Sequence, residues 1–80
     1  MMHEAEQFDE LTVQARIGAN IRLRREKVGL SQRALAERAD IHRSVLNQLE
    51  NGCRGCTVTV LARLAVELGT SPSALVIDIV

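Results

Sequence analysis

The chain has 80 residues, enough for one small domain, and its ten basic and ten acidic residues give a formal net charge of zero. Hydrophobic residues make up 46% of the sequence and aromatic residues 1%, with Phe8 the sole aromatic side chain. A core of Leu, Ile, Val and Ala favours packed helices over a sheet. No apolar run approaches the roughly 20 residues of a membrane span, and the acidic first ten residues lack the apolar stretch of a signal peptide. We therefore expect a cytoplasmic protein without membrane contact.

Charge is distributed unevenly along the chain. Residues 1–10 contain four acidic residues and no Lys or Arg, which indicates an acidic arm over residues 1–9 ahead of a folded domain over residues 10–80. Residues 16–54 contain nine basic and four acidic residues, a net charge of +5 that would attract phosphate groups. An ordinary solvated surface would fit the same pattern, so charge by itself does not establish nucleic-acid binding.

The first predicted helix spans residues 10–28. This segment lacks proline, its single Gly18 is tolerable, and Gly29 is expected to end the helix. Four apolar side chains recur at helical spacing and define an inward face: Val13, Ile17, Ile21 and Val28.

Two short helices are predicted next, over residues 32–38 and 43–50. Ser31 suits the N-cap of the first, because its hydroxyl can accept a hydrogen bond from a free backbone N–H in the first turn. His42 holds the corresponding position before the second, and the Asn-Gly pair at residues 51–52 is a strong stop signal. The inward-facing residues of both helices are Leu35, Ala36, Ala39, Val45, Leu46 and Leu49.

The rest of the chain predicts a loop over residues 52–56 and two further helices. Thr57 caps the fourth helix, and Ser71 followed by Pro72 begins a short fifth helix. The fourth helix has an apolar stripe of Val60 or Leu61 with Leu64, Ala65 and Leu68. The predicted fold class is all-α, with five helices in one compact domain.

The second and third helices, joined by about four residues, have the arrangement of a helix-turn-helix. The specific signal is the run Gly-Leu-Ser-Gln at 29–32 followed by Leu35, Ala36, Ile41 and Leu46, then Gln-Leu-Glu-Asn-Gly at 48–52. In these residues the chain resembles the Cro/C1-type helix-turn-helix family over residues 13–76, which implies a lambda-repressor-like fold. The stretch from His42 to Ser44, with Arg54, most resembles the controller proteins of restriction–modification systems.

The polar face of the helix over residues 43–50 is where we expect base-reading side chains. Arg43 can donate two hydrogen bonds to guanine and Gln48 can pair with adenine, each worth about 1–3 kcal/mol of discrimination. The family resemblance supports these two residues and Ser44, and it adds Arg54 beyond the helix end. The full predicted base-reading set is Arg43, Ser44, Asn47, Gln48 and Arg54.

Phosphate contacts would set the position of the domain on DNA without reading sequence. Gln32 begins a helix whose N-terminus is a ready phosphate site, and the resemblance implies that its side chain also braces the next helix. The predicted phosphate set is Gln32, Arg33, Arg24, His42 and Asn51, although each Arg would also fit an ordinary surface charge. The resemblance further implies a buried ion pair between Arg25 and Glu50, which would fix orientation more than add stability.

Other reactive residues do not form a recognisable catalytic or metal site. His42 has no partner cluster that would make it a catalytic base. Cys53 with Cys56 supplies only half of a zinc site, for which His3 and His42 are the only other candidate ligands. We expect two thiols in a loop, with Cys56 partly buried; the alternative is a disulfide switch that would reshape the loop carrying Arg54. We expect no catalytic activity, cofactor, metal or small-molecule ligand.

The apolar tail over residues 75–80 and the outer face of the fourth helix predict a homodimer interface. The residues assigned to it are Val60, Leu75, Val76, Ile77 and Ile79. The alternative is that the tail folds back on its own core. A two-fold dimer would place two reading helices about 34 Å apart, on a pseudo-palindromic operator.

The sequence therefore predicts a homodimeric, sequence-specific transcriptional regulator of double-stranded DNA, with a restriction–modification controller as the leading interpretation. Two alternatives remain. One is an antitoxin that covers a toxin with its apolar tail and represses its own promoter, and the other is a phage Cro- or repressor-like regulator. The neighbouring gene would distinguish them: a toxin, or a restriction enzyme with a methyltransferase.

Overall fold

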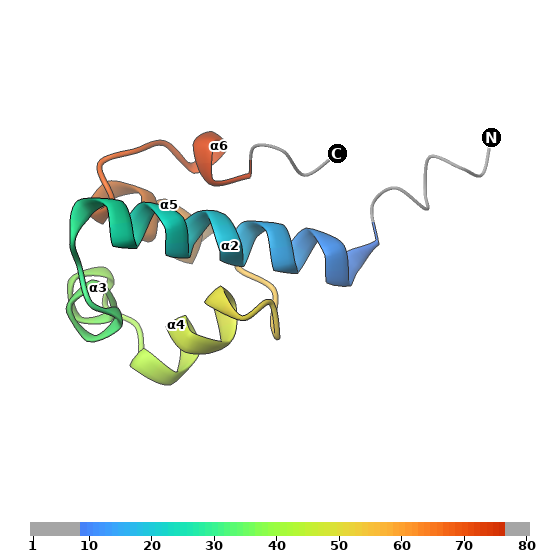
Figure 1. Cartoon of the computed structure of the whole chain (residues 1–80), viewed down its shortest axis with the longest axis horizontal. Coiled ribbons are helices and arrows are strands. Elements are labelled where there is room, and N and C mark those ends of the chain that lie inside the picture. Colours follow the sequence, from blue (N-terminus) through green and yellow to red (C-terminus); the bar gives the residue numbers. More distant parts are fainter. Residues whose placement is uncertain (1–8, 77–80) are drawn as a thin grey trace.

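The computed structural model describes residues 9–76, and all regular structure within that range is helical. The helices are α2 (Glu10–Val28), α3 (Gln32–Ala39), α4 (Arg43–Glu50), α5 (Val58–Glu67) and α6 (Pro72–Leu75). The long helix α2 crosses the molecule, with α3 and α4 on one side of it and α5 and α6 toward the other (Figure 1). The all-α prediction of five helices is confirmed. None of the described helices is long and apolar enough to cross a membrane.

Side-chain caps explain where most of these helices begin. A side-chain oxygen before the first turn accepts a backbone N–H at the start of four helices, and such a cap is typically worth about 0.5–2 kcal/mol. The capping residues are Asp9 for α2, Ser31 for α3, Thr57 for α5 and Ser71 for α6. His42 holds the N-cap position of α4, but its side chain makes no capping hydrogen bond. The predicted starts of these helices are therefore correct.

The hydrophobic core lies where the helices meet and is aliphatic throughout. Six large side chains are fully buried: Ile21, Leu35, Leu46, Leu64, Leu68 and Leu75. Burying a side chain of this size is worth about 1.5–3 kcal/mol, so the packing of the short helices depends on these contacts. The amide of Asn20 on α2 also donates to the carbonyl oxygen of Leu75 at 2.9 Å, which joins α6 to α2.

The burial of Leu75 corrects its assignment to a dimer interface. Its side chain is 0% exposed because α6 directs it into the monomer's own core, the alternative considered for the tail. Val60 and Val76 are half-buried against the same core. Ile77 and Ile79 lie outside the described residues. The large apolar side chains of α5 that do face outward are Val58 and Val66, which are 79% and 73% exposed.

Two further details differ from the sequence prediction. Helix α3 ends at Ala39, one residue later than predicted, and this alanine is buried. Val28 was predicted to face inward but is 48% exposed. Helical spacing places a residue on a face, whereas burial also requires another element opposite it, and α2 ends immediately after Val28.

The backbones of α2 and of the end of α4 lie so close together that two glycines are needed between them. A Cβ atom on Gly18 would lie 2.1 Å from the carbonyl oxygen of Leu49, and one on Gly52 would lie 2.8 Å from the Cα atom of Ala15. Gly52 also has a φ of +72°, which favours glycine. Gly18 is therefore required by packing, although the sequence indicated only that it was tolerable.

Replacing Gly18 by alanine should destabilise the protein. In an unobstructed helix this change would raise the free energy of unfolding by about 1 kcal/mol. Here the added methyl group would meet the Leu49 backbone, so we expect a loss of about 1–3 kcal/mol in urea unfolding. Gly55→Ala is the matched control, because the nearest atom to its new Cβ is 3.6 Å away. A Gly18→Ala variant more stable than the unaltered protein would contradict the close approach.

Candidate nucleic-acid interface

A tight turn over residues 40–42 sets the angle between α3 and α4. Asp40 adopts a left-handed conformation with φ of +60°, which Asp tolerates better than most residues, and its N–H donates to the carbonyl oxygens of the last turn of α3. Ile41 then donates its N–H to the carbonyl oxygen of Ala36 at 3.0 Å and packs against the core. The turn therefore anchors the start of α4.

Helix α4 has one buried and one exposed face. Leu46 and Leu49 are 0% and 3% exposed and fix the inner face against the core. The four predicted base-reading residues of this helix, Arg43, Ser44, Asn47 and Gln48, are all exposed. In Figure 1 the helix lies at the edge of the molecule, away from α5 and α6. Its polar face is therefore accessible to a large ligand.

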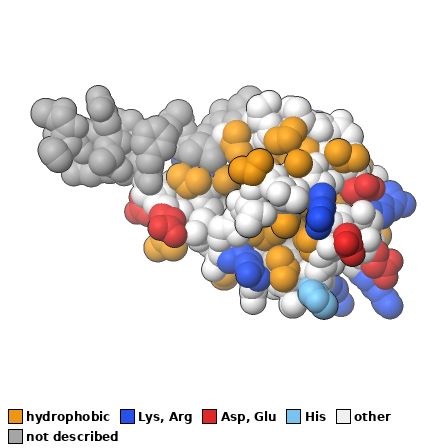
Figure 2. Space-filling model, turned by 180° about the vertical axis from the view of Figure 1, so that it is seen from behind, with side chains coloured by type: hydrophobic (Ala, Val, Ile, Leu, Met, Phe, Trp, Pro, Cys, Tyr) orange, Lys and Arg blue, Asp and Glu red, His pale blue; other side chains and the backbone are white. Residues whose placement is uncertain are grey.

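The start of α3 and the exposed face of α4 form one shallow groove. It is lined by Gln32, Arg43, Ser44 and Asn47, two of which come from the N-terminal turn of α4. Figure 2 shows Lys and Arg side chains scattered over the lower and right-hand parts of one face of the molecule, among acidic and hydrophobic side chains. The groove itself is lined by one arginine and by three uncharged side chains that can donate hydrogen bonds.

The remaining predicted phosphate contacts do not line this groove. Arg33 is exposed on α3 and lies 3.8 Å from the carboxylate of Glu37. His42 and Asn51 are exposed at the two ends of α4. Arg24 is half-buried on α2 and does not line the groove.

A buried ion pair joins α2 to the last residue of α4. Arg25 donates from Nε and Nη2 to the two carboxylate oxygens of Glu50, at 2.7 and 3.0 Å, and from Nη1 to the carbonyl oxygen of Leu30. The side chains of Arg25 and Glu50 are 12% and 1% exposed. The hydrogen bond to Glu50 raises the pKa of the Arg25 guanidinium above its ordinary value. The ion pair expected from the family resemblance is confirmed.

Three amide side chains extend from this ion pair to the exposed face. Gln32 donates to Glu50 at 2.9 Å, Asn47 donates to the Gln32 oxygen at 3.3 Å, and Asn51 donates to the Asn47 oxygen at 3.2 Å. We call Gln32, Asn47 and Asn51 the amide series. The bracing role of Gln32 is confirmed, whereas its continuation through Asn47 was missed. The only sequence signal was the spacing of four residues between the two asparagines.

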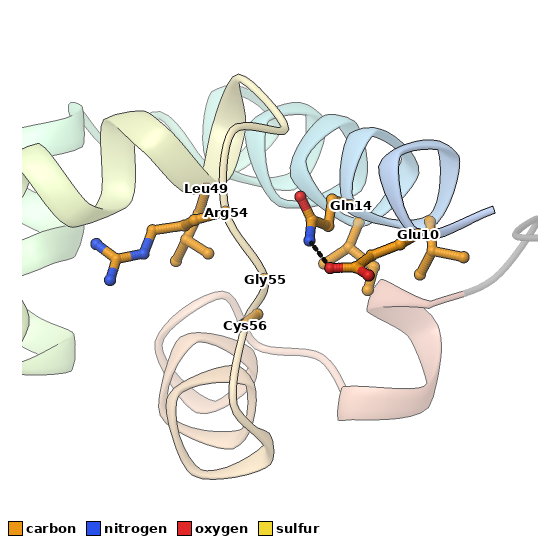
Figure 3. Close-up of a pocket in the computed structure, with 8 residues that line it drawn as sticks. Glu10, Gln14, Leu49, Arg54, Gly55 and Cys56 are labelled. Atoms are coloured by element: carbon orange, nitrogen blue, oxygen red, sulfur yellow. Dashed lines mark hydrogen bonds between the residues drawn. The ribbon is translucent and has the colours of Figure 1, made fainter. Parts of the chain in front are cut away.

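Arg54 reaches back from the loop after α4 to the exposed face of that helix. Its Nη1 donates to the side-chain oxygen of Gln48 at 2.9 Å. Figure 3 shows the Arg54 side chain directed toward α4, away from Glu10 and Gln14. The structure therefore brings together two residues of the predicted base-reading set that are six positions apart. Sequence reasoning did not predict this contact.

Both cysteines of the loop are free thiols. Cys53 is exposed, whereas Cys56 is half-buried in a mostly apolar pocket between α2 and the loop (Figure 3). Burial raises the pKa of the Cys56 thiol, which reduces its thiolate fraction and hence its reactivity. This agrees with the expected partial burial of Cys56.

Comparison with known sequences identifies relatives of this chain. A family model described as "Helix-turn-helix" matches residues 21–75. Control protein C.MunI from Mycoplasma sp is 34% identical over 68 residues, which cover 84% of this chain and 92% of that protein. The propionyl-CoA carboxylase regulator of Cereibacter sphaeroides is 41% identical over 58 residues. The chain spans only 13% of that longer regulator.

Solved structures with the same fold include both small and large proteins. The restriction-modification controller protein C.AhdI from Aeromonas hydrophila superposes with a TM-score of 0.75 and 31% identity, over 78% of this chain and 94% of that one. Hydroxypropylphosphonic acid epoxidase from S. wedmorenis gives a TM-score of 0.75 and 35% identity over 81% of this chain, but over only 35% of the enzyme.

Removing the buried carboxylate should destabilise the domain without removing an exposed contact. Glu50→Ala would leave the Arg25 guanidinium without its partner, at a cost of about 3–5 kcal/mol in the free energy of unfolding. Glu37→Ala is the matched control, because that carboxylate is exposed and its pair with Arg33 should be worth less than about 1 kcal/mol. Thermal unfolding measures both. An unchanged melting temperature for Glu50→Ala would refute the structural role of the pair.

Proposed function

The chain belongs to the helix-turn-helix family, and we propose that it is a sequence-specific DNA-binding transcriptional regulator of the restriction–modification controller type. The observation that carries this proposal is the polar, exposed face of α4, fixed to the rest of the domain by the buried Arg25–Glu50 pair. A duplex is the ligand that such a face fits, because the major groove admits one α-helix and presents base edges to it.

In this proposal α4 lies in the major groove and its neighbours hold the backbone. The side chains that face base edges are those that share one exposed surface, Arg43, Ser44, Asn47, Gln48 and Arg54. The phosphate contacts come from Gln32 and Arg33 on α3, from His42 and Asn51 at the ends of α4, and from Arg24 on α2. Such contacts supply affinity that depends on salt, while the base contacts supply discrimination.

We propose that the active form is a homodimer that pairs through α5. Val58, Ala62 and Val66 are spaced four residues apart and form one outward stripe, of which both valines are strongly exposed. Val60 and Val76, which the sequence assigned to the interface, are half-buried against the core and are not part of this stripe. Exposed apolar residues in a row favour a self-complementary two-fold contact, which would place two α4 helices about 34 Å apart on a pseudo-palindromic operator.

Two observations on relatives support the controller assignment over other classes. C.MunI is matched over 92% of its length and C.AhdI over 94%, so both resemble this chain nearly from end to end. The similarity to the epoxidase covers about a third of that enzyme, so it gives no reason to propose catalysis here. We further propose that the protein acts in the cytoplasm, where its duplex DNA ligand would be found.

Footprinting on the DNA upstream of the gene for this chain tests the proposed function. We expect protection of two related half-sites whose centres are about one helical turn apart. A single protected half-site would contradict the dimer, and the absence of any protected sequence at moderate salt would contradict the regulator.

Two arginine variants separate base reading from phosphate binding. Arg43→Ala should reduce discrimination between the footprinted site and unrelated DNA by about 1–3 kcal/mol. Arg33→Ala should weaken binding to all sequences alike and reduce the salt dependence. Arg22→Ala, at an exposed arginine on α2 outside both the helix-turn-helix and the proposed dimer contact, is the control and should leave discrimination unchanged. Equal effects of Arg43→Ala and Arg33→Ala would contradict the division of roles.

A further inference from the structure

The carbonyl oxygens of two neighbouring amides on α4 already accept hydrogen bonds from within the protein. The Asn47 oxygen accepts from Asn51 at 3.2 Å, and the Gln48 oxygen accepts from Arg54 at 2.9 Å. Both residues belong to the predicted base-reading set, and both are exposed. An amide can pair with adenine only by accepting with its oxygen while donating with its nitrogen. These two contacts therefore bear directly on which base α4 selects.

A charged residue that can only accept, or only donate, hydrogen bonds fixes the orientation of these amides. It does so either directly or through a neighbouring amide. The ionised carboxylate of Glu50 only accepts, so Gln32 must present its amide nitrogen to it. Gln32 thereby presents its oxygen to the Asn47 nitrogen, and the Asn47 oxygen is turned to Asn51. Every amide of the series therefore donates with its nitrogen toward the buried carboxylate and has its oxygen on the side away from it.

The same logic applies to Gln48. The Arg54 guanidinium has five N–H donors and no acceptor, so Gln48 must meet it with its oxygen. The N–H groups of Gln48 and the unused donors of Arg54 are then offered together. Arg43 adds a further guanidinium to the exposed face, and Glu50, the single acidic residue of α4, is buried. The face presented to DNA is therefore rich in donors.

We propose that this donor-rich face selects guanine rather than adenine at the base pair that Gln48 contacts. Guanine presents two acceptors in the major groove, N7 and O6, whereas adenine presents one acceptor and an amino donor. That amino group would have to share the Gln48 oxygen with Arg54 and lie beside the positive charge of the guanidinium. The inference rests on the proposed function and deepens it.

Selection from a pool of duplexes of randomised sequence tests the inference with four proteins. The base pair contacted by Gln48 is identified as the position at which Gln48→Ala abolishes the preference. At that position the unaltered protein should prefer guanine to adenine at least about fivefold, the lower end for one bidentate contact. Replacing this guanine by 7-deazaguanine, which lacks the N7 acceptor, should weaken binding.

Arg54→Ala is the decisive variant, because it frees the Gln48 oxygen. The preference at the Gln48 position should shift from guanine toward adenine, by at least about fivefold in the ratio of affinities. Arg22→Ala, at an exposed arginine of α2 outside the predicted contact sets, is the control and should keep the guanine preference. Circular dichroism should show unchanged folding, since both Gln48 and Arg54 are exposed.

The outcomes separate this inference from the proposed function. If no sequence is enriched by the unaltered protein, the proposed regulator function is wrong. If sequences are enriched but adenine occupies the Gln48 position, or guanine is still preferred there by Arg54→Ala, the function stands and the inference is wrong. If Gln48→Ala changes the base preference at no position, the proposed function again stands and the inference is wrong.

Discussion

The buried carboxylate of Glu50 is the group around which this small domain is arranged. Its side chain is 1% exposed, and a charge removed from water to this extent is very unfavourable unless it is paired and hydrogen-bonded. Here two donors come from Arg25 on α2 and one from Gln32 on α3. The carboxylate is the last residue of α4, so its requirements hold three helices in one arrangement.

The pairing of Glu50 helps to explain how α4, a helix of only eight residues, can hold its exposed polar face in a fixed position. An isolated helix of this length would not be stable in water. Leu46 and Leu49 fix its inner face, Ile41 anchors its start, and the close backbone approach at Gly18 fixes its end against α2. The polar side chains on the opposite face are consequently held by a rigid frame, which is what a base-reading surface requires.

The hydrogen bonds of the amide series extend from the Glu50 carboxylate to the exposed face of α4. Because Glu50 can only accept, each successive amide is oriented, and Arg54 imposes the matching orientation on Gln48. The buried carboxylate therefore sets the orientation of Gln32, Asn47 and Asn51, whereas Arg54 sets that of Gln48. Side-chain identity by itself would leave Gln48 free to read adenine, and the difference lies in its contact with a residue six positions further along the chain.

Local signals were sufficient to predict the helices. Ser31, Thr57 and Ser71 are capping residues whose effect is local, so the starts of their helices follow from the sequence. The exposed face of α4 follows from helical spacing, and the ion pair followed from the family resemblance.

The features that could not be predicted depend on which other segment of the chain packs against a residue, and only the fold determines that. Leu75 was assigned to a dimer interface because an apolar tail does not reveal which surface will cover it. Val28 is left 48% exposed because no helix of the described part of the chain covers it, and Gly18 is needed only because the α4 backbone approaches α2. The contact between Gln48 and Arg54 depends on the path of the loop after α4.

The central claim is that α4 meets a duplex with its polar face while the buried pair stays intact, and an NMR titration tests it most directly. The ¹⁵N-labelled protein would be titrated with a duplex recovered by selection, and both backbone amides and the Arg25 Nε–H signal would be followed. The account predicts the largest shift changes at Arg43, Ser44 and Gln48, with a persistent, slowly exchanging Arg25 signal. Largest changes on α5 with α4 unaffected, or loss of the Arg25 signal on binding, would contradict it.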